Sequence, residues 1–558
     1  MTTLARDIAV IAGAALALLA APPVGAQAPD ARPPKRLIAT GGDSPDTAQL
    51  RAHLAVMERR PFDGVVLRAV GRDDAGGPVD LARSFGREAW KPAWFQTCID
   101  DLQACRFERF TDNFVLVGAN PGDVDWFDDA GWAQIVEHWR IAARVAKTGG
   151  LRGICFDPEP YTRPHDPFRY GGDPPVRESP PFEAVAAKAR ERGRAVMRAV
   201  AAEHPSVTIL AYFLLCASRL AAAQPDPRPA LAGRDYGLLP AFLDGWLDEA
   251  PPTVTLVDGC ENAYRFNSDL EFLEAANEIR NGAQALVSPA NRSRYRAQVQ
   301  AGFGIYLDAH VSPPGSAWHI DRLGGTPARR LRANVAAALR AADQYVWIYG
   351  ERHRWFPLPG APERTDWNEA MPGCEEALRL ARDPAAFARA RIAALAREGT
   401  LLDLAQEGDF AAGPEGGAPA GWTAWQDEKS RGALAWDGTT GASGAGSAKA
   451  SGAASGCFLQ AVPVRPGALY AVRASRRLAG RGDAELRLRW QTAEGRWTTG
   501  AQDVIVTAPG PRDAWSEMVT AAEVPPGAGR LVVLLTVIGQ AAPGDAAWFD
   551  DVRVHRLE

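Results

Sequence analysis

The chain has 558 residues and a formal net charge of −5 at pH 7, from 62 Lys and Arg against 67 Asp and Glu. This balance, with no basic patch, argues against nucleic acid as the partner. A hydrophobic content of 46% allows a sizeable core, and the length exceeds that of one small domain.

The first thirty residues have the pattern of a secretory signal. Arg6 precedes an uncharged apolar run over 8–21, and small residues at 24–28 offer cleavage sites. The run is too short to span a bilayer comfortably, and no later stretch is a spanning candidate. We therefore expect residues 1–28 to be a cleaved signal peptide and the mature protein to be secreted or periplasmic, without a membrane span. The alternative is an anchor that is retained.

Eight short β-rich runs alternate with helical segments over 36–397. The strands are expected at 37–40, 63–68, 114–119, 153–157, 207–213, 253–258, 302–308 and 344–350. Helices are expected at 46–59, 130–147, 182–203, 239–249, 268–279, 327–342 and 375–398. Eightfold alternation predicts an α/β fold, a (β/α)₈ barrel over 36–397. The alternative, an open doubly wound sheet, lacks its glycine-rich phosphate motif here.

The composition changes near Gly399, where helical periodicity stops. Short alternating strands follow at 456–464, 468–476, 484–490, 531–538 and 547–555, with a loop-like Gly/Ala/Ser stretch at 441–456. This spacing predicts a second domain over 400–558, an all-β sandwich. Seven cysteines fit no zinc site, although Cys98 and Cys105 could form a short disulfide in an oxidising compartment.

Polar and aromatic side chains cluster where the predicted barrel strands end. The active site of such barrels lies at the C-terminal strand ends, and alternation along each strand shows which side chains face inward. The residues expected at this mouth are Arg68, Asn120, Asp157, Glu159, Tyr161, Tyr212, Asp258, Glu261, Tyr264, Asp308, His310, Trp347, Tyr349 and Glu351.

Paired carboxylates do the chemistry of most glycoside hydrolases. Aromatic faces stack on sugar rings, and Trp126, Trp132 and Trp355 are further candidates near strand ends. A single carboxylate here is more often a turn former or an ion-pair partner, as Glu351 could be for Arg352. Several acidic strand ends together with aromatic residues favour a functional cleft.

The segment 153–161, Gly-Ile-Cys-Phe-Asp-Pro-Glu-Pro-Tyr, resembles the fourth-strand signature of chitinase-type glycoside hydrolases of family 18, which ends in Asp-x-Glu. The resemblance implies that Glu159 is the general acid and that Asp157 orients a substrate acetamido group. Arg152 and Cys155 stand at the earlier acidic positions of that signature, and Pro158 replaces the usual aromatic residue.

The tail is similar to the jelly-roll carbohydrate-binding modules that accompany polysaccharide-degrading enzymes. The segments 407–410, 421–422, 460–462, 466–470 and 548–552 carry this likeness. It implies a jelly-roll sandwich and a structural calcium, for which Glu407 and Asp550 are the candidate ligands. Sugar platforms would come from one or two of Trp422, Trp425, Trp436, Trp490, Trp497 and Trp515, the rest filling the core.

Together these patterns predict an exported glycoside hydrolase that acts on a polysaccharide or glycan without a catalytic cofactor. Glu159 is the first candidate for acid/base catalysis, and Glu351 and Glu261 are candidates for the second carboxylate. One alternative is a non-catalytic glycan-binding protein on a barrel scaffold. Another is a metal-dependent hydrolase or deacetylase that uses Asp308 and His310.

Overall fold

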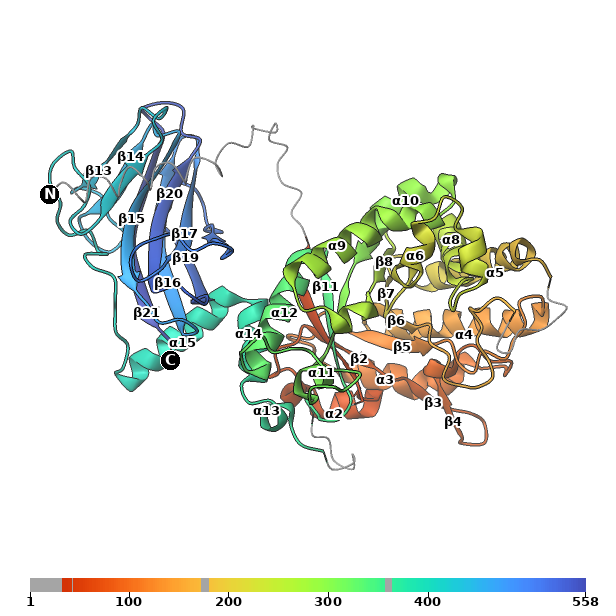
Figure 1. Ribbon diagram of the computed structural model, residues 1–558. Coiled ribbons are helices and arrows are strands. Elements are labelled where there is room, and N and C mark those ends of the chain that lie inside the picture. Colours follow the sequence, from red (N-terminus) through yellow and green to blue (C-terminus); the bar gives the residue numbers. More distant parts are fainter. Residues whose placement is uncertain (1–32, 43, 172–179, 357–363, 558) are drawn as a thin grey trace. The chain divides into compact units, whose positions relative to one another are not determined.

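The computed structural model describes residues 33–42, 44–171, 180–356 and 364–557. The predicted signal peptide, residues 1–28, lies outside the described residues. Contacts divide the chain into two compact units, with the division between Arg382 and Asp383. Figure 1 shows the first unit as parallel strands surrounded by helices and the second as antiparallel sheets. No helix in these ranges is both long enough and apolar enough to cross a bilayer.

The first unit is built on one parallel sheet. Its strands are β1 (Arg36–Gly41), β2 (Gly64–Leu67), β5 (Phe114–Gly118), β6 (Gly153–Asp157), β7 (Thr208–Ala211), β8 (Thr255–Asp258), β9 (Val299–Ala301), β10 (Phe303–Tyr306) and β11 (Tyr345–Gly350). They pair in the order β10-β11-β1-β2-β5-β6-β7-β8-β9. The two ends of this order, β9 and β10, are separated in the chain by Gly302 alone. They are halves of one seventh strand, so the sheet closes and the predicted barrel is confirmed.

Gly302 is the joint of that interrupted strand. Its amide donates to Asp258 O at 2.9 Å, which ties it to the sixth strand. A Cβ at this position would lie 2.7 Å from Val257 Cγ1, closer than van der Waals contact. A larger residue at this position would therefore need the Val257 side chain to move.

Helices cover the outside of the barrel, as predicted from their periodicity. They include α2 (Thr47–Met57), α4 (Asp129–Thr148), α5 (Phe182–Glu203), α8 (Leu239–Glu249), α9 (Asp269–Arg280), α12 (Pro327–Ala341) and α14 (Cys374–Arg382). A hairpin of β3 (Val70–Arg72) and β4 (Pro78–Asp80), followed by α3 (Gln96–Ala104), stands between the second and third barrel strands. Asp46 and Gln49 form a capping box at the start of α2, which satisfies amides that the helix cannot pair internally.

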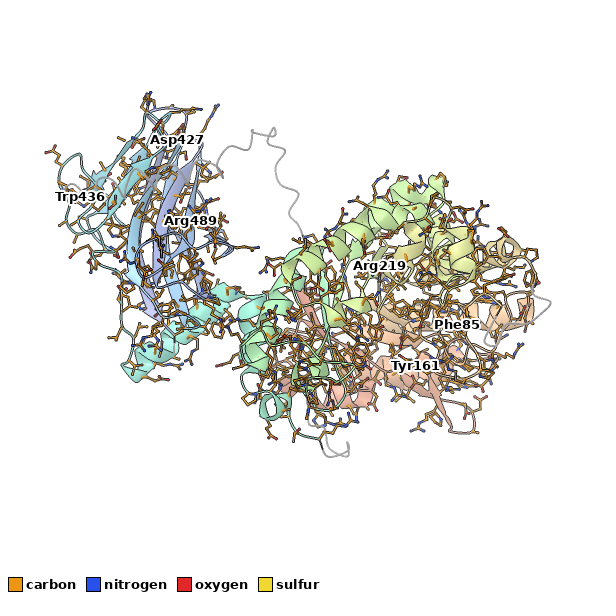
Figure 2. All side chains as sticks on the ribbon, viewed as in Figure 1. Phe85, Tyr161, Arg219, Asp427, Trp436 and Arg489 are labelled. Carbon is orange, nitrogen blue, oxygen red and sulfur yellow. The ribbon has the colours of Figure 1, made fainter. Side chains whose placement is uncertain are left out.

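A layer of aromatic rings fills the space between the sheet and its helices. Phe85 (Figure 2) lies within 6.5 Å, between ring centroids, of Trp132, Trp139 and Phe156. Trp126 stacks on Trp132 at 4.7 Å. Trp126, Trp132 and Trp355 are all buried, so the expectation that they stack on sugar is wrong. They pack into the core because their indole rings offer large apolar area.

Phe156→Ala is expected to lower the free energy of unfolding of the barrel by about 3–5 kcal/mol. Phe156 is fully buried and touches the rings of Trp139 and Trp246, so truncation leaves a cavity. Guanidinium unfolding followed by tryptophan fluorescence measures the loss. Leu270→Ala, at a side chain that is 61% exposed, is the control and should change little.

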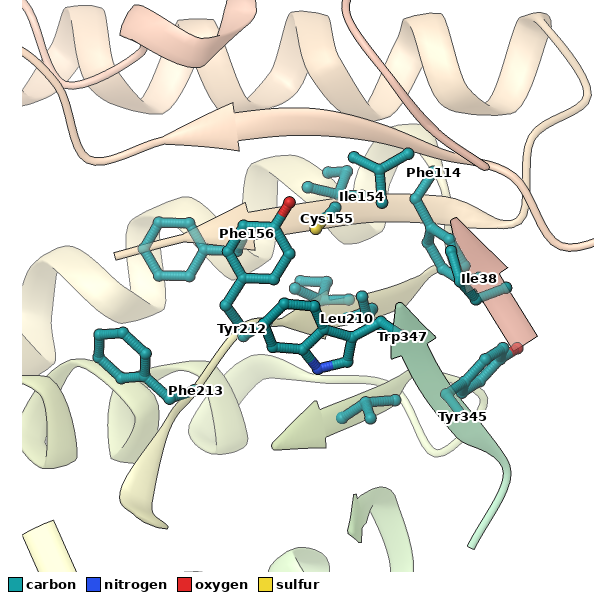
Figure 3. Close-up of a cluster of buried hydrophobic side chains, with 14 of the residues drawn as sticks. Ile38, Phe114, Ile154, Cys155, Phe156, Leu210, Tyr212, Phe213, Tyr345 and Trp347 are labelled. Carbon is teal, nitrogen blue, oxygen red and sulfur yellow. The ribbon is translucent and has the colours of Figure 1, made fainter. Parts of the chain in front are cut away.

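Inside the barrel the predicted inward-facing residues meet. Trp347 and Tyr212 lie side by side (Figure 3), and their stacked rings have centroids 4.5 Å apart. Tyr349 stands edge-on to both rings. Trp347 and Tyr349, from the strand predicted at 344–350, thus meet Tyr212 from the strand predicted at 207–213.

The second unit is a sandwich of two five-stranded antiparallel sheets. One has the order β12-β15-β20-β17-β18 and the other β13-β14-β21-β16-β19. The five predicted strands correspond to β15 (Ser455–Pro463), β16 (Leu469–Ala479), β17 (Asp483–Gln491), β20 (Arg530–Ile538) and β21 (Ala546–Arg556). The strands not predicted are β12 (Thr423–Gln426), β13 (Ala433–Asp437), β14 (Ser447–Ser451), β18 (Val504–Val506) and β19 (Ser516–Glu523). Of these, β14 lies in the Gly/Ala/Ser stretch expected to be a loop.

The helical region expected at 375–398 is two helices. α14 ends at Arg382, and α15 (Pro384–Glu398) begins after Asp383, whose side chain accepts from the amide of Ala386. Arg389 of α15 pairs with Glu517, and Arg391 donates to Leu557 O at 3.0 Å. The composition change at Gly399 thus marks the end of a helix that packs on the sandwich, while the division of units precedes that helix.

All seven cysteines are buried free thiols. Cys98 and Cys105 are not joined, and the Cys105 thiol donates to Asp101 O at 3.4 Å instead. The disulfide that the sequence allowed between them is not formed in this structure: Cys98 lies within α3 and Cys105 directly after it, and both thiols are buried.

Candidate active site

Asp157 ends β6 at the C-terminal mouth of the barrel, and the loop after it carries Glu159. The buried Asp157 carboxylate accepts from the Glu159 amide at 3.0 Å. Asn120 holds the same loop from the neighbouring strand end. Its Nδ2 donates to Glu159 O at 3.0 Å, and its Oδ1 accepts from the Tyr161 amide at 2.7 Å. Asn120 is therefore a positioning residue for this loop.

The Glu159 side chain is half-buried and lines a cleft. Its Oε2 accepts from the hydroxyl of Tyr161 at 2.6 Å, which orients the carboxylate. The Tyr161 side chain (Figure 2) is 65% exposed, so its ring is open to a ligand at the rim.

Glu261 enters the same cleft from the end of β8. Cys260 adopts a left-handed backbone with φ 43°, and this turn starts the short helix η5 (Glu261–Arg265) directly after the strand. The Glu261 amide donates to Tyr212 O at 3.1 Å. Non-glycine residues adopt such a backbone only where the surroundings fix it, so the position of Glu261 is firmly set.

Glu351 follows β11 and completes the group. Tyr306 donates its hydroxyl to Glu351 Oε2 at 3.0 Å, and Tyr349 donates to Oε1 at 3.2 Å. The Glu351 amide donates to Asp308 at 2.8 Å. This carboxylate is exposed at the rim but held by two phenols.

Four of the six carboxylates predicted at the mouth, Asp157, Glu159, Glu261 and Glu351, interact electrostatically. Burial raises the pKa of Glu261 to about 8, and the charges of Glu159, Asp157 and Glu351 contribute to this rise. Burial likewise raises the pKa of Asp157 to about 7, with a contribution from the Glu159 charge. Like charges at short range cannot all ionise, so protons are retained at this mouth near neutral pH.

Aromatic rings surround the carboxylates. Tyr264 stacks on Tyr306 at 5.0 Å, and Trp318 meets the edge of both rings. Trp347 is fully buried, and its Nε1 donates to Gly259 O at 2.8 Å. Together with Tyr212 it forms the floor beneath the mouth. Because it is buried, contacts with a ligand would come from the residues above it.

The cleft itself has a volume of about 950 Å³. Besides Glu159 and Glu261 it is lined by residues that the sequence patterns did not single out: Arg169, Arg234, Tyr236, Arg265 and Trp318. They lie in connections between strands and helices, where no hydrophobic period marks a functional side chain. The only signal in the sequence that could have identified them as cleft residues was their position a short distance along the chain from an acidic strand end.

Asp308 and His310 do not face the mouth as expected. The strand ends at Tyr306, and the short helix α11 (Leu307–Val311) replaces the alternation assumed for 302–308. Asp308 is fully buried, accepts from the amides of Glu351 and Arg352, and pairs with the Arg352 guanidinium at 2.7 Å. It therefore braces the loop that carries Glu351.

The His310 ring packs against α12. Its Nδ1 lies 3.1 Å from Tyr306 O, and its Nε2 lies 3.4 Å from Asn334 Nδ2. Burial lowers its pKa to about 4, so the ring is neutral at pH 7. Across the described ranges no three His, Cys, Asp or Glu side chains gather in a set able to hold a metal.

Asp258 and Arg68 also serve the scaffold. Asp258 is fully buried and accepts from the amides of Leu214 and Cys216 at 2.9 and 2.8 Å. Arg68 is ion-paired to Asp80 on β4. Neither contributes to the electrostatic group formed by the four carboxylates.

In the sandwich, the two predicted calcium ligands differ in surroundings. Asp550 is buried, and its oxygens accept from the amides of Ala442 at 2.6 Å and Asp551 at 2.7 Å. Glu407 is exposed. Because both Asp550 oxygens already accept amide hydrogens, the visible role of this residue is to tie the turn at Ala442 to β21, and the calcium site stays a prediction.

The sandwich tryptophans divide into two groups. Trp422 and Trp490 are buried in the core between the sheets. Trp425 and Trp497 are only partly buried and pack on a separate cluster of Cys457, Val532 and Leu534. Arg489 lies over the Trp497 ring at 4.8 Å. Trp436 and Trp515 are also partly buried.

No protein-family model and no curated protein matches the sequence. Among solved structures, the bacteriophage CBA120 tailspike protein 4 enzymatically active domain is 16% identical, with 28% of this chain and 21% of that one covered and a TM-score of 0.23. TmCBM61, solved with β-1,4-galactotriose, is 18% identical, with 28% and 99% covered and a TM-score of 0.21. The CBM22-1–GH10 modules of Clostridium thermocellum xylanase 10B, solved with xylohexaose, are 15% identical, with 24% and 26% covered and a TM-score of 0.20.

Proposed function

We propose that this protein is an exported glycoside hydrolase that cleaves a polysaccharide or glycan by carboxylate acid/base catalysis. The observation that carries the proposal is the group of four carboxylates at the barrel mouth. Two of them, Asp157 and Glu261, have pKa values raised to about 7 and about 8. Such a group offers a proton donor and an ionised partner at the same pH, which glycosidic cleavage requires.

Within this group Glu261 is the proposed proton donor. Its raised pKa keeps it protonated at neutral pH, and it lines the cleft. Glu159 lines the same cleft and is oriented by Tyr161, which suits the partner that acts as base or nucleophile. The family 18 resemblance assigns the donor role to Glu159 instead, and the two assignments predict different kinetics.

The remaining two carboxylates have supporting roles in this proposal. Asp157 holds the Glu159 amide and so positions the loop. The charge of Glu351 raises the pKa of Glu261, while the hydroxyls of Tyr306 and Tyr349 hold Glu351 in place. Removal of either the Asp157 or the Glu351 carboxylate should shift the pH profile of kcat/KM as well as lower the rate.

The pH profile of kcat/KM tests the donor assignment. A donor with a raised pKa is protonated below that value, so activity should fall as pH rises through about 8. In Glu351→Gln the basic limb should move to lower pH, because one of the charges that raises the Glu261 pKa is gone. A basic limb that does not move in this variant would contradict the assignment.

We further propose that the sandwich holds the enzyme on insoluble glycan through Trp425 and Trp497. In the full chain, the double change to Ala at these positions should weaken pull-down by an insoluble polysaccharide. Turnover of a small soluble substrate should stay unchanged, because the module acts only through effective concentration. Leu402→Ala, at a side chain that is 71% exposed, is the control. Equal pull-down by all three proteins would reduce the sandwich to a spacer.

A further inference from the structure

Three arginines line the cleft beside the carboxylates. Arg169, Arg234 and Arg265 line it together with Glu159 and Glu261. Arg169 is paired with Asp235, also in the cleft, at 3.2 Å. Arg234 and Arg265 have no such carboxylate partner among the residues that the structure describes, so their charges are open to a ligand.

Arg265 is presented as a flat, stacked guanidinium. It is the last residue of η5, the same short helix that begins with Glu261. Its guanidinium carbon lies 4.1 Å from the ring centroid of Trp318, and Nη1 donates to Ala317 O at 3.1 Å. Within the described ranges no carboxylate oxygen lies within ion-pair distance of it. Stacking fixes the plane of the group and leaves most of its five donors unused.

Arg234 follows α7 (Arg228–Ala232) and is half-buried. Among the described residues its guanidinium has neither an ion pair nor a hydrogen bond. A partly desolvated cation without a partner is costly, and at the wall of a cleft the cost is recovered when an anion binds. The neighbouring Asp235 does not serve as that anion, since it pairs with Arg169.

We propose that the cleft binds a glycan that carries carboxylate groups, a uronic-acid sugar, through Arg234 and Arg265. Guanidinium groups match planar carboxylates bidentately, whereas a neutral sugar carries no charge to pair with the half-buried Arg234 and the exposed Arg265. The sugar ring would lie against Trp318, which lines the cleft and is 39% exposed. The inference rests on the proposed function, because it names the substrate class of that same cleft.

Binding to matched ligands tests this directly. Oligouronates of galacturonic, glucuronic and mannuronic acid are titrated into the full-length Glu261→Gln variant by calorimetry. The same oligomers with their carboxylates reduced to alcohols, and sulfated neutral oligomers, are the comparison ligands. At least one oligouronate should bind, and Arg234→Met with Arg265→Met should weaken it roughly ten- to a hundredfold. The reduced oligomer should bind more weakly and respond little to these changes.

Arg219→Met is the matched control, because Arg219 pairs with Glu278 and does not line this cleft. It should leave oligouronate binding unchanged. The inference is overturned if no oligouronate binds, if the double arginine variant binds as the parent does, or if only sulfated oligomers depend on the arginines. Arginine-dependent binding without cleavage by the unmodified enzyme would support the inference and count against the hydrolase. If the enzyme instead cleaves a neutral glycan and the double arginine variant cleaves it equally well, the hydrolase is supported and the inference is overturned.

Discussion

Glu261→Gln is expected to lower kcat/KM on a natural glycan by about 10²–10⁴-fold while the protein stays folded. Glutamine keeps the shape of the side chain but cannot release a proton to the leaving oxygen. The change also removes a carboxyl group whose ionised form is disfavoured by burial and by three neighbouring charges, so the fold should not lose stability. Initial rates over a range of substrate concentrations, with the unfolding midpoint measured in parallel, check both statements.

An activated substrate sharpens the test of Glu261. An aryl glycoside with an acidic phenol as leaving group needs little protonation, so Glu261→Gln should retain much of its activity on it. The matched control is Glu249→Gln, since Glu249 pairs with Arg198 on the surface and does not line the cleft. Equal losses on the natural and the activated substrate would remove Glu261 from the donor role.

Glu159→Gln is expected to cost a similar factor, about 10²–10⁴, but on both kinds of substrate. A base or nucleophile is needed whatever the leaving group, so an activated phenol cannot compensate for its loss. Tyr161→Phe removes only the hydroxyl that orients Glu159 from 2.6 Å, and a smaller loss is expected for it. Rates on natural and aryl substrates measured side by side distinguish the two glutamates.

The family 18 resemblance predicts a different pattern. If Glu159 is the donor and the substrate acetamido group held by Asp157 is the nucleophile, Glu159→Gln recovers on the activated substrate, and Glu261→Gln should lose little on either substrate. Near-normal rates in both variants would mean that these carboxylates only form ion pairs or hydrogen bonds at the rim. If the parent cleaves no glycan at all, the protein is better described as a glycan-binding barrel.

The barrel could be predicted from the sequence because its signals are local. Each strand is a short β-rich run, and the period of two assigned Trp347 and Tyr349 to the inside, where they meet Tyr212. The four acidic residues at strand ends were found for the same reason. Parallel strands bring their C-terminal ends to one edge of the sheet, so residues distant in sequence had to converge there.

Prediction from local sequence failed where contacts with segments distant in the chain determine the backbone conformation. The segment around Asp308 and His310 has the alternation of a strand, yet it turns into α11 because Asp308 pairs with the loop after β11. The Gly/Ala/Ser stretch that contains β14 looks like a loop, yet its backbone pairs with β13 and β21. The hydrogen bonds of strand pairing stabilise this segment as a strand, and local composition does not reveal whether a pairing partner is present.

The sequence by itself determined the order of strands and helices, the sandwich after them and the acidic residues at the mouth. Only the tertiary structure decided that β9 and β10 close the barrel through Gly302, and that Trp126, Trp132 and Trp355 are core. It also decided which carboxylates keep a proton, and that Arg234 and Arg265 share their cleft. The physical reason is that burial and electrostatic interaction depend on distances between side chains far apart in the chain, which hydrophobic period and spacing do not encode.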